Sequence, residues 1–251
     1  MGKIYFYKED NEDILPYINI KYTLNGNLFN GNFILDIGSN ITTYFSDNSE
    51  KKIKIFIKSI EGYDIETEYT IFVQKSIFKN KNNIIKIDGL IGLSILSKYC
   101  LKINFNRNEF YLNKEYNIAK YNKVNSYFDD NYLIVNLNIN DEEFNLLYDT
   151  GSSKDVILFE GRTKNISYQN KFDGLKASGQ LGNEYSIIPL EKVVKIDFFK
   201  IGVFETKINI MLKHPMINNI PLEINGIIGN QFFRHKEIII DYPNKKLLVK
   251  K

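Results

Sequence analysis

Apolar and polar residues alternate along much of the chain, which is the period of a β-strand with one buried face. Residues 17–24 alternate in this way and are followed by the turn residues Asn25-Gly26-Asn27, so a hairpin is predicted there. Residues 53–73 alternate around Glu61-Gly62 and predict a second hairpin. Phe and Tyr, with 18 and 17 copies, also favour strands. We therefore expect an all-β fold with short helices.

The alternation stops in the middle of the chain and then resumes. Residues 113–130 are polar and have no firm periodicity, and the alternation returns from Leu133 onward. A polar, aperiodic stretch of this kind is typical of a boundary between domains. We therefore predict an N-terminal lobe over residues 1–115, an interlobe linker over residues 116–130 and a C-terminal lobe over residues 131–251.

The two predicted lobes contain the same segment. Residues 89–112 align without a gap with residues 226–249 at an offset of 137 (226 − 89), and the copies begin with Gly-Leu-Ile-Gly and Gly-Ile-Ile-Gly. Residues 95–99, inside the first copy, can form one or two helical turns. Two copies are too few for a solenoid, but they suit a pseudo-twofold dimer fused into one chain.

Each copy also has an acid at the end of an apolar run. Asp36 follows Ile34-Leu35, and Asp149 follows Leu147-Tyr148, 113 residues later (149 − 36). The second copy has 24 more residues (137 − 113) between its acid and its glycine pair. Pseudo-twofold symmetry places equivalent residues across the axis, so we expect Asp36 and Asp149 to face each other.

Two facing carboxylates have a distinct chemistry. They cannot both ionise easily, so the pair shares a proton, and one acid can take a proton from a water while the other protonates a carbonyl oxygen. Gly38 and Gly151 would let the backbone turn tightly beside that water. Ser39 and Ser152 can donate hydrogen bonds to the carboxylates.

These motifs resemble those of the aspartic protease superfamily, specifically the retropepsin-like bacterial aspartyl proteases. The second copy has Asp-Thr-Gly-Ser at 149–152 and Ile-Ile-Gly at 227–229; the first has Asp-Ile-Gly-Ser at 36–39 and Leu-Ile-Gly at 90–92. The resemblance covers residues 17–249 and implies two pseudo-twofold-related, retropepsin-like β-barrel lobes. A single Asp-x-Gly-Ser is commonly only a turn, and the repetition favours the family interpretation.

The resemblance implies an endopeptidase whose water is activated by the catalytic residues Asp36 and Asp149. It assigns active-site loop support to Ile37, Gly38, Ser39, Thr150, Gly151 and Ser152. In the family, the residue after the acid bonds across the lobe interface through a hydroxyl, which Thr150 has and Ile37 lacks. One alternative is therefore a catalytically weak or inactive peptide-binding pseudoprotease. Another is a homodimer in which only the second lobes are active.

The resemblance also implies a flap that closes over a bound peptide. The hairpin turn at Glu61 and Gly62 and the glycine-dotted segment from Gly179 to Gly182 match the flap position. Tyr185 lies just past that segment, but with 17 tyrosines in the chain a core or surface role is favoured over a flap role. We expect a peptide or protein substrate and a monomer.

Other functional classes have little support. The chain has 33 basic and 30 acidic residues, and a net charge of +3 does not favour nucleic acid. Cys100 is the only cysteine, His214 and His235 lie in unrelated contexts, and Asp88 is interpreted as a loop acid. No zinc spacing or phosphate loop is present, so we predict no metal and no cofactor.

No apolar run reaches the roughly 18 residues of a membrane span. The chain as given is expected to be soluble, in the cytoplasm or, if a leader has been removed, in the cell envelope or secreted.

Overall fold

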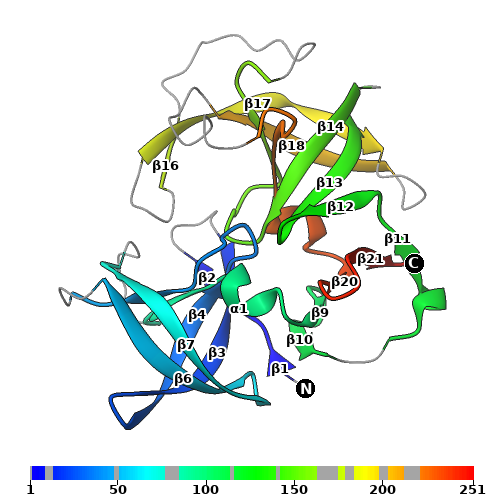
Figure 1. Ribbon diagram of the computed structural model, residues 1–251. Helices are drawn as coiled ribbons and strands as arrows, with labels where there is room; N and C mark the ends of the chain where they lie inside the picture. Colours follow the sequence, from blue (N-terminus) through cyan, green and yellow to red (C-terminus); the bar gives the residue numbers. More distant parts are fainter. Residues whose placement is uncertain are drawn as a thin grey trace.

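The computed structural model describes ten stretches of the chain: residues 2–8, 14–47, 51–76, 85–113, 116–139, 142–162, 175–178, 184–197, 203–211 and 221–251. It is an all-β, two-lobed structure with short helices, in which each half of the chain forms a sheet of its own and a third sheet takes strands from both halves (Figure 1). The fold class predicted from the sequence is confirmed.

The first lobe is a seven-stranded sheet in the order β2-β3-β4-β8-β5-β7-β6, and it closes into a barrel because β3 also pairs with β6. Its strands are β2 (Tyr5–Lys8), β3 (Ile14–Leu24), β4 (Asn27–Leu35), β5 (Thr43–Phe45), β6 (Lys52–Ile60), β7 (Tyr63–Gln74) and β8 (Gly89–Ile91). The alternating segments before and after Glu61-Gly62 thus form the β6–β7 hairpin, as predicted.

The second lobe repeats this order strand for strand. Its sheet is β12-β13-β14-β19-β15-β18-β17-β16, and β13 also pairs with β17, which closes the second barrel. Its strands are β12 (Ser126–Asp129), β13 (Tyr132–Ile139), β14 (Glu142–Asp149), β15 (Val156–Phe159), β16 (Leu175–Ser178), β17 (Glu184–Asp197), β18 (Val203–Met211) and β19 (Gly226–Gly229). Among the strands that the structure describes, only β16 has no counterpart in the first lobe, and it lies within the extra residues of the second copy.

The third sheet has six strands in the order β1-β10-β9-β20-β21-β11, which is symmetric about its centre. They are β1 (Gly2–Lys3), β10 (Glu109–Leu112), β9 (Cys100–Asn104), β20 (Glu237–Asp241), β21 (Lys246–Lys250) and β11 (Tyr121–Lys123). At the centre β9 and β20 are antiparallel, and Lys102 pairs with Ile239, its own counterpart at the 137-residue offset. The pseudo-twofold axis therefore passes through this pair.

The two halves also have matching short helices, and they share one hydrophobic core. Helix α1 (Leu93–Leu96) follows β8 and the 3₁₀ helix η3 (Asn230–Phe233) follows β19, again 137 residues apart. One apolar cluster includes buried side chains from the first lobe, the shared sheet and the second lobe, among them Phe33, Ile103 and Phe144. The two halves therefore fold around a continuous core.

The predicted interlobe linker differs from what the structure shows. Residues 116–130 include the 3₁₀ helix η1 (Ile118–Lys120) and the strands β11 and β12. By position in the sheets, β11 and β12 are the counterparts of β1 and β2, so the second repeat begins inside the range predicted to be a linker. These strands have only three and four residues, too few for the alternation to stand out in a polar stretch.

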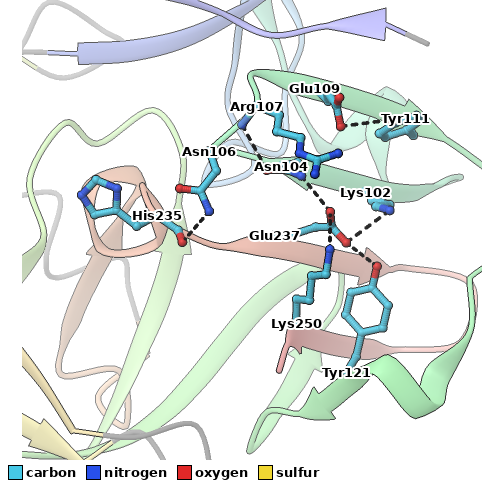
Figure 2. A network of polar contacts seen from close by, with 10 residues as sticks. All are labelled: Lys102, Asn104, Asn106, Arg107, Glu109, Tyr111, Tyr121, His235, Glu237 and Lys250. Atoms are coloured by element: carbon cyan, nitrogen blue, oxygen red, sulfur yellow. Dashed lines mark hydrogen bonds and ion pairs between the residues drawn. The ribbon is translucent and has the colours of Figure 1, made fainter.

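A buried acid on β20 joins the two halves through the shared sheet. Figure 2 shows Lys102, Lys250 and Tyr121 converging on the Glu237 carboxylate. The Tyr121 hydroxyl donates to Glu237 at 2.5 Å, and the Asn104 side-chain amide donates to it at 2.8 Å. Because Lys102 and Asn104 belong to the first half and Glu237 to the second, the network holds the halves together.

Candidate active site

Equivalent pairs of strands deliver the two acids. β4 runs parallel to β8 with Leu35 opposite Ile91, and β14 runs parallel to β19 with Tyr148 opposite Ile228. The residues just before each acid are apolar, Phe33-Ile34-Leu35 on β4 and Leu146-Leu147-Tyr148 on β14, as is typical of the buried ends of parallel strands. Asp36 and Asp149 therefore follow equivalent positions in the two barrels.

The second glycine of each pair packs against an acid loop. A Cβ atom at Gly92 would overlap the carbonyl oxygen of Ile41, and one at Gly229 would overlap that of Lys154. Ile41 and Lys154 are themselves counterparts at the 113-residue offset. Any side chain would push the loop away, so these positions require glycine for close approach.

Backbone hydrogen bonds also join the segment after this glycine to the acid loop of the same lobe, in both halves. The Leu93 N–H donates to the Ser39 carbonyl at 2.8 Å, and the Asn230 N–H donates to the Ser152 carbonyl at 3.0 Å. In the second half, the Asn230 side-chain amide also donates to the Thr150 carbonyl at 3.1 Å. Each acid loop is thus fixed by the segment that begins the helix of its own lobe.

The two acid loops meet each other at their glycines. A Cβ atom at Gly38 would overlap the carboxyl group of Asp149, and one at Gly151 would lie 2.7 Å from Cγ of Asp36. Each carboxylate also accepts a hydrogen bond from its own loop, Asp36 from the Gly38 N–H at 3.1 Å and Asp149 from the Gly151 N–H at 2.8 Å. The structure therefore brings both acids and both glycines to one place.

Burial and mutual contact set the electrostatics of the two acids. Asp36 is buried and Asp149 is half-buried. Burial raises the pKa of Asp149, while hydrogen bonds from Asp36 and from the Gly151 and Ser152 N–H groups oppose this effect, and the net direction is upward. A hydrogen bond between two carboxyl groups requires a proton on one of them. The geometry thus permits one proton shared between the two acids.

Thr150 links the loops across the interface. Its hydroxyl donates to the Leu35 carbonyl at 2.5 Å and accepts from the Ile37 N–H at 3.0 Å. Ile37, the counterpart of Thr150, is fully buried in the apolar core. The bond across the interface is therefore made by a side chain from one lobe only.

The serine hydroxyl of the first loop bonds within its own loop. The Ser39 hydroxyl donates to the Ile41 carbonyl and accepts from the Ile41 N–H, both at 3.2 Å. In the second loop the Ser152 N–H donates to the Asp149 carbonyl at 3.2 Å. Donation from either hydroxyl to a carboxylate stays a prediction.

The two predicted flap hairpins are not equivalent in the structure. Glu61 and Gly62 form the turn from β6 to β7, where the Glu61 carboxylate accepts from the Lys3 N–H at 2.9 Å and the Asn19 N–H at 2.6 Å. The counterpart of this turn is the β17–β18 connection, because β6 and β17 close the two barrels. Gly179 and Gly182 instead lie in the β16–β17 connection, outside the described residues.

Tyr132, on β13, is a site neighbour that the sequence did not reveal. Its half-buried side chain has a hydroxyl that bonds the side chain of Asn40, in the first acid loop. Burial, Asp36 and Asp149 raise the pKa of Tyr132. More than 90 residues separate Tyr132 from Asn40 in the sequence, and no motif links them.

Asp88 has the loop role expected for it. Its carboxylate accepts from the Asn32 N–H at 3.0 Å and pairs with Lys86 at 2.8 Å. In the second lobe its counterpart Asn225 accepts from the Asn145 N–H at 2.8 Å. The same polar bridge thus supports the Asp strand in both halves.

The remaining candidates do not form a second site within the described residues. His235 is exposed, and its carbonyl accepts from Asn106 (Figure 2), whereas His214 lies outside the described residues. Burial raises the pKa of the Cys100 thiol to about 12, so the thiol stays protonated. In the described stretches, no three His, Cys, Asp or Glu side chains gather as a metal site would require. Nor does any helix in these stretches have the length and apolar character needed to cross a membrane.

Comparisons with known proteins support the fold. No family model and no curated protein matches the sequence. Among solved structures, the chain is similar to conglutin gamma, a basic 7S globulin from lupine seeds. That match has a TM-score of 0.56 and 9% identity and covers 99% of this chain and 94% of the other. At this identity the likeness shows a shared fold alone.

Proposed function

We propose that the protein is an aspartic endopeptidase that hydrolyses peptide bonds with a water activated by Asp36 and Asp149. The observation that carries this proposal is the reciprocal packing of each acid on the glycine of the opposite loop. Two carboxyl groups in contact favour a shared proton, and the raised pKa of Asp149 supports retention of that proton.

The reaction follows from one ionised and one protonated acid. The ionised carboxylate takes a proton from the water, whose oxygen attacks the peptide carbonyl carbon, while the protonated acid gives its proton to the carbonyl oxygen. Proton transfer to the peptide nitrogen then allows the C–N bond to break. The products are a new carboxyl group and a new amine, and the acid pair again holds one proton.

An extended peptide is the substrate that best suits this site. Peptides bound in extended form are held by strand-like hydrogen bonds and by pockets for alternate side chains. Both acids come from one chain, so a monomer has a complete pair. We infer that the active form is monomeric rather than a dimer that joins two second lobes.

Replacement of each acid tests the proposal. Asp36→Asn and Asp149→Asn should each lower the rate of cleavage of a denatured protein by about 10³-fold between acid and neutral pH, because general acid–base catalysis is lost. Asp64→Asn, at an exposed position on β7, is the matched control and should keep the wild-type rate. Unchanged cleavage by both active-site variants would end the proposal.

A peptide-binding pseudoprotease is the second candidate. Ile37 favours it, because the first lobe supplies no hydroxyl to the hydrogen bonds between the two acid loops. This candidate predicts that the wild-type protein binds a peptide without turnover. Binding measured by calorimetry and cleavage measured by mass spectrometry on the same peptide separate the two. Affinity with no product after long incubation at every pH would favour the binding protein.

A further inference from the structure

The apolar residues beside the two acids differ in exposure between the lobes. Ile34 lies two residues before Asp36, on the same face of the chain, and pairs with Leu90 on β8. Both apolar side chains are buried, at 1% and 2% exposure. Their counterparts, Leu147 on β14 and Ile227 on β19, pair in the same way but are only half-buried. The same apolar face is therefore covered in the first lobe and partly exposed in the second.

A further strand of each lobe adds one residue to this face. The antiparallel register of β3 and β4, continued by two residues beyond its last pair, places Leu15 beside Asp36. The register of β13 and β14, continued in the same way, places Tyr132 beside Asp149. Both side chains are half-buried and pack against the apolar cluster of their own lobe. The two faces are thus built from equivalent positions.

The outer strand of each lobe explains why only one face is covered. Tyr7, on β2, is buried in one apolar cluster with Ile34 and Leu90. By strand pairing, its counterpart on β12 is Asp129, which pairs with Tyr132 and is exposed. An aromatic ring therefore lies over the apolar face of the first lobe, whereas the equivalent residue of the second lobe is a solvated carboxylate that leaves the face accessible.

The acid loops show the same difference between the lobes. Asp36 is 4% exposed, whereas Asp149 is half-buried. Ser39 is buried and its counterpart Ser152 is half-buried. The accessible part of the acid pair thus lies on the side of the second lobe, next to the exposed apolar face.

We propose that Tyr7 fills the place for a substrate side chain in the first lobe, so that the protein selects a large apolar side chain through the second lobe alone. Leu147, Ile227 and Tyr132 form the face that would contact this side chain. The pseudo-twofold axis relates the two acids, so positions on either side of the scissile bond meet equivalent surfaces of the two lobes. This selection rests on the proposed binding of an extended peptide at the acid pair.

Three capped alanine octapeptides test the selection on the wild-type protein, with no Phe, one central Phe or two adjacent central Phe residues. The first Phe should raise kcat/KM about tenfold or more, because one apolar side chain gains a partner surface. The second should add no more than about twofold, since adjacent side chains of an extended peptide point to opposite sides and cannot share one face. An equal gain from each Phe, or no gain from the first, would overturn the proposal.

Two variants assign the selection to residues. Tyr7→Ala should uncover the face of the first lobe, so that the second Phe now gives a gain of several-fold. Leu147→Ala should reduce the gain from the first Phe several-fold. Each gain is a ratio between peptides on one variant, so a partly unfolded sample does not change it. Tyr5→Ala, at an exposed position on the same strand as Tyr7, is the control and should keep the wild-type ratios. Wild-type ratios in Tyr7→Ala or Leu147→Ala would contradict the assignment.

Calorimetry with the same peptides separates this selection from the proposed hydrolysis. If no peptide is cleaved, the hydrolysis proposal fails, but the dissociation constant should still fall about tenfold with the first Phe and little further with the second. Dissociation constants that do not fall with the first Phe, or that fall equally with each, would overturn the selection by the second lobe whether or not cleavage occurs.

Discussion

At the scale of single residues, the Thr150 hydroxyl makes two of the hydrogen bonds that join the acid loops. Thr150 satisfies both the carbonyl of Leu35 and the N–H of Ile37, and it is fully buried. A symmetric pair of loops would have this arrangement twice. Because Ile37 cannot make the reciprocal bonds, these bonds between the acid loops rest on Thr150 alone.

Thr150→Val should therefore be costly although it conserves shape. The substitution leaves a buried carbonyl and a buried N–H without their partner, and we expect a loss of about 2–3 kcal/mol in the free energy of unfolding. Thr150→Ser keeps the hydroxyl and should lose less than half as much. Denaturant titration of both variants measures the difference, and equal losses would contradict the role of the hydroxyl.

Ile37→Thr supplies the missing hydroxyl. By the 113-residue offset, this hydroxyl should donate to the Tyr148 carbonyl and accept from the Thr150 N–H, mirroring the bonds that Thr150 makes. We expect the rate of peptide cleavage to rise several-fold, because the loops are then held from both sides. Ile37→Val, which shortens the side chain without a hydroxyl, is the control. A rate no higher than that of the Val variant would show that the two missing hydrogen bonds between the loops do not limit the cleavage rate.

Gly38→Ala should abolish the contact between the acids. Its methyl group would overlap the Asp149 carboxyl group, so we expect a loss of 10²-fold or more in cleavage, about what misplacement by an ångström costs. Gly26→Ala is the matched control, since its Cβ meets open space and only its φ of +78° is strained. It should cost about 1 kcal/mol of stability and leave the cleavage rate unchanged. A Gly38→Ala variant with wild-type activity would contradict the close approach.

The sequence predicted only part of the residue-level site. Asp36 and Asp149 stood out because the same short pattern occurs twice after apolar runs. Tyr132 and Asn40 did not, because their contact joins distant segments and neither residue belongs to a repeated motif. A tertiary contact between unrelated positions leaves no trace in a single sequence.

At the scale of elements, strand length decided what could be predicted. β3, β6 and β7 have nine to twelve residues, and their alternation predicted them. β11 and β12 have three and four residues, and the sequence pattern over their range predicts a linker instead. Such short strands are specified by pairing with β21 and β13 rather than by their own pattern.

The turn sequences alone do not show which hairpins of the two lobes correspond. Glu61 and Gly62 both have positive φ values, as the two central residues of any type I′ hairpin turn do. Sheet order, and not the turn, distinguishes the β6–β7 hairpin from the additional β16–β17 hairpin of the second lobe. That order depends on long-range pairing between β3 and β6, which no local pattern encodes.

At the scale of the whole molecule, the shared sheet makes one unit of the two lobes. Glu237 lies on β20 next to the pseudo-twofold axis and is only 6% exposed. Burial would raise its pKa, but hydrogen bonds from Tyr121 and Lys102 and the charge of Lys250 bring the net pKa below its usual value. Its stabilising effect is therefore present above the usual Glu pKa and is lost as the pH falls through the lowered one.

Glu237→Gln should destabilise the protein in a pH-dependent way. At pH 7 we expect a loss of about 2 kcal/mol in the free energy of unfolding, since a charged, buried acceptor of several bonds is removed. The difference from the wild type should shrink as the pH falls through the lowered pKa of Glu237, where the wild-type carboxylate takes up its proton. Glu68→Gln, which removes an exposed ion pair with Lys54, should cost less than 1 kcal/mol. A pH-independent difference would contradict the ionised state of Glu237.

The central claim is that Asp36 and Asp149 act as one unit, and the cleavage rates of Asp36→Asn, Asp149→Asn and the double variant test it most directly. If the acids share one proton and one water, each single variant loses about 10³-fold, and the double variant loses no more than either single one. Losses that multiply in the double variant, or wild-type rates in both single variants, would contradict the account.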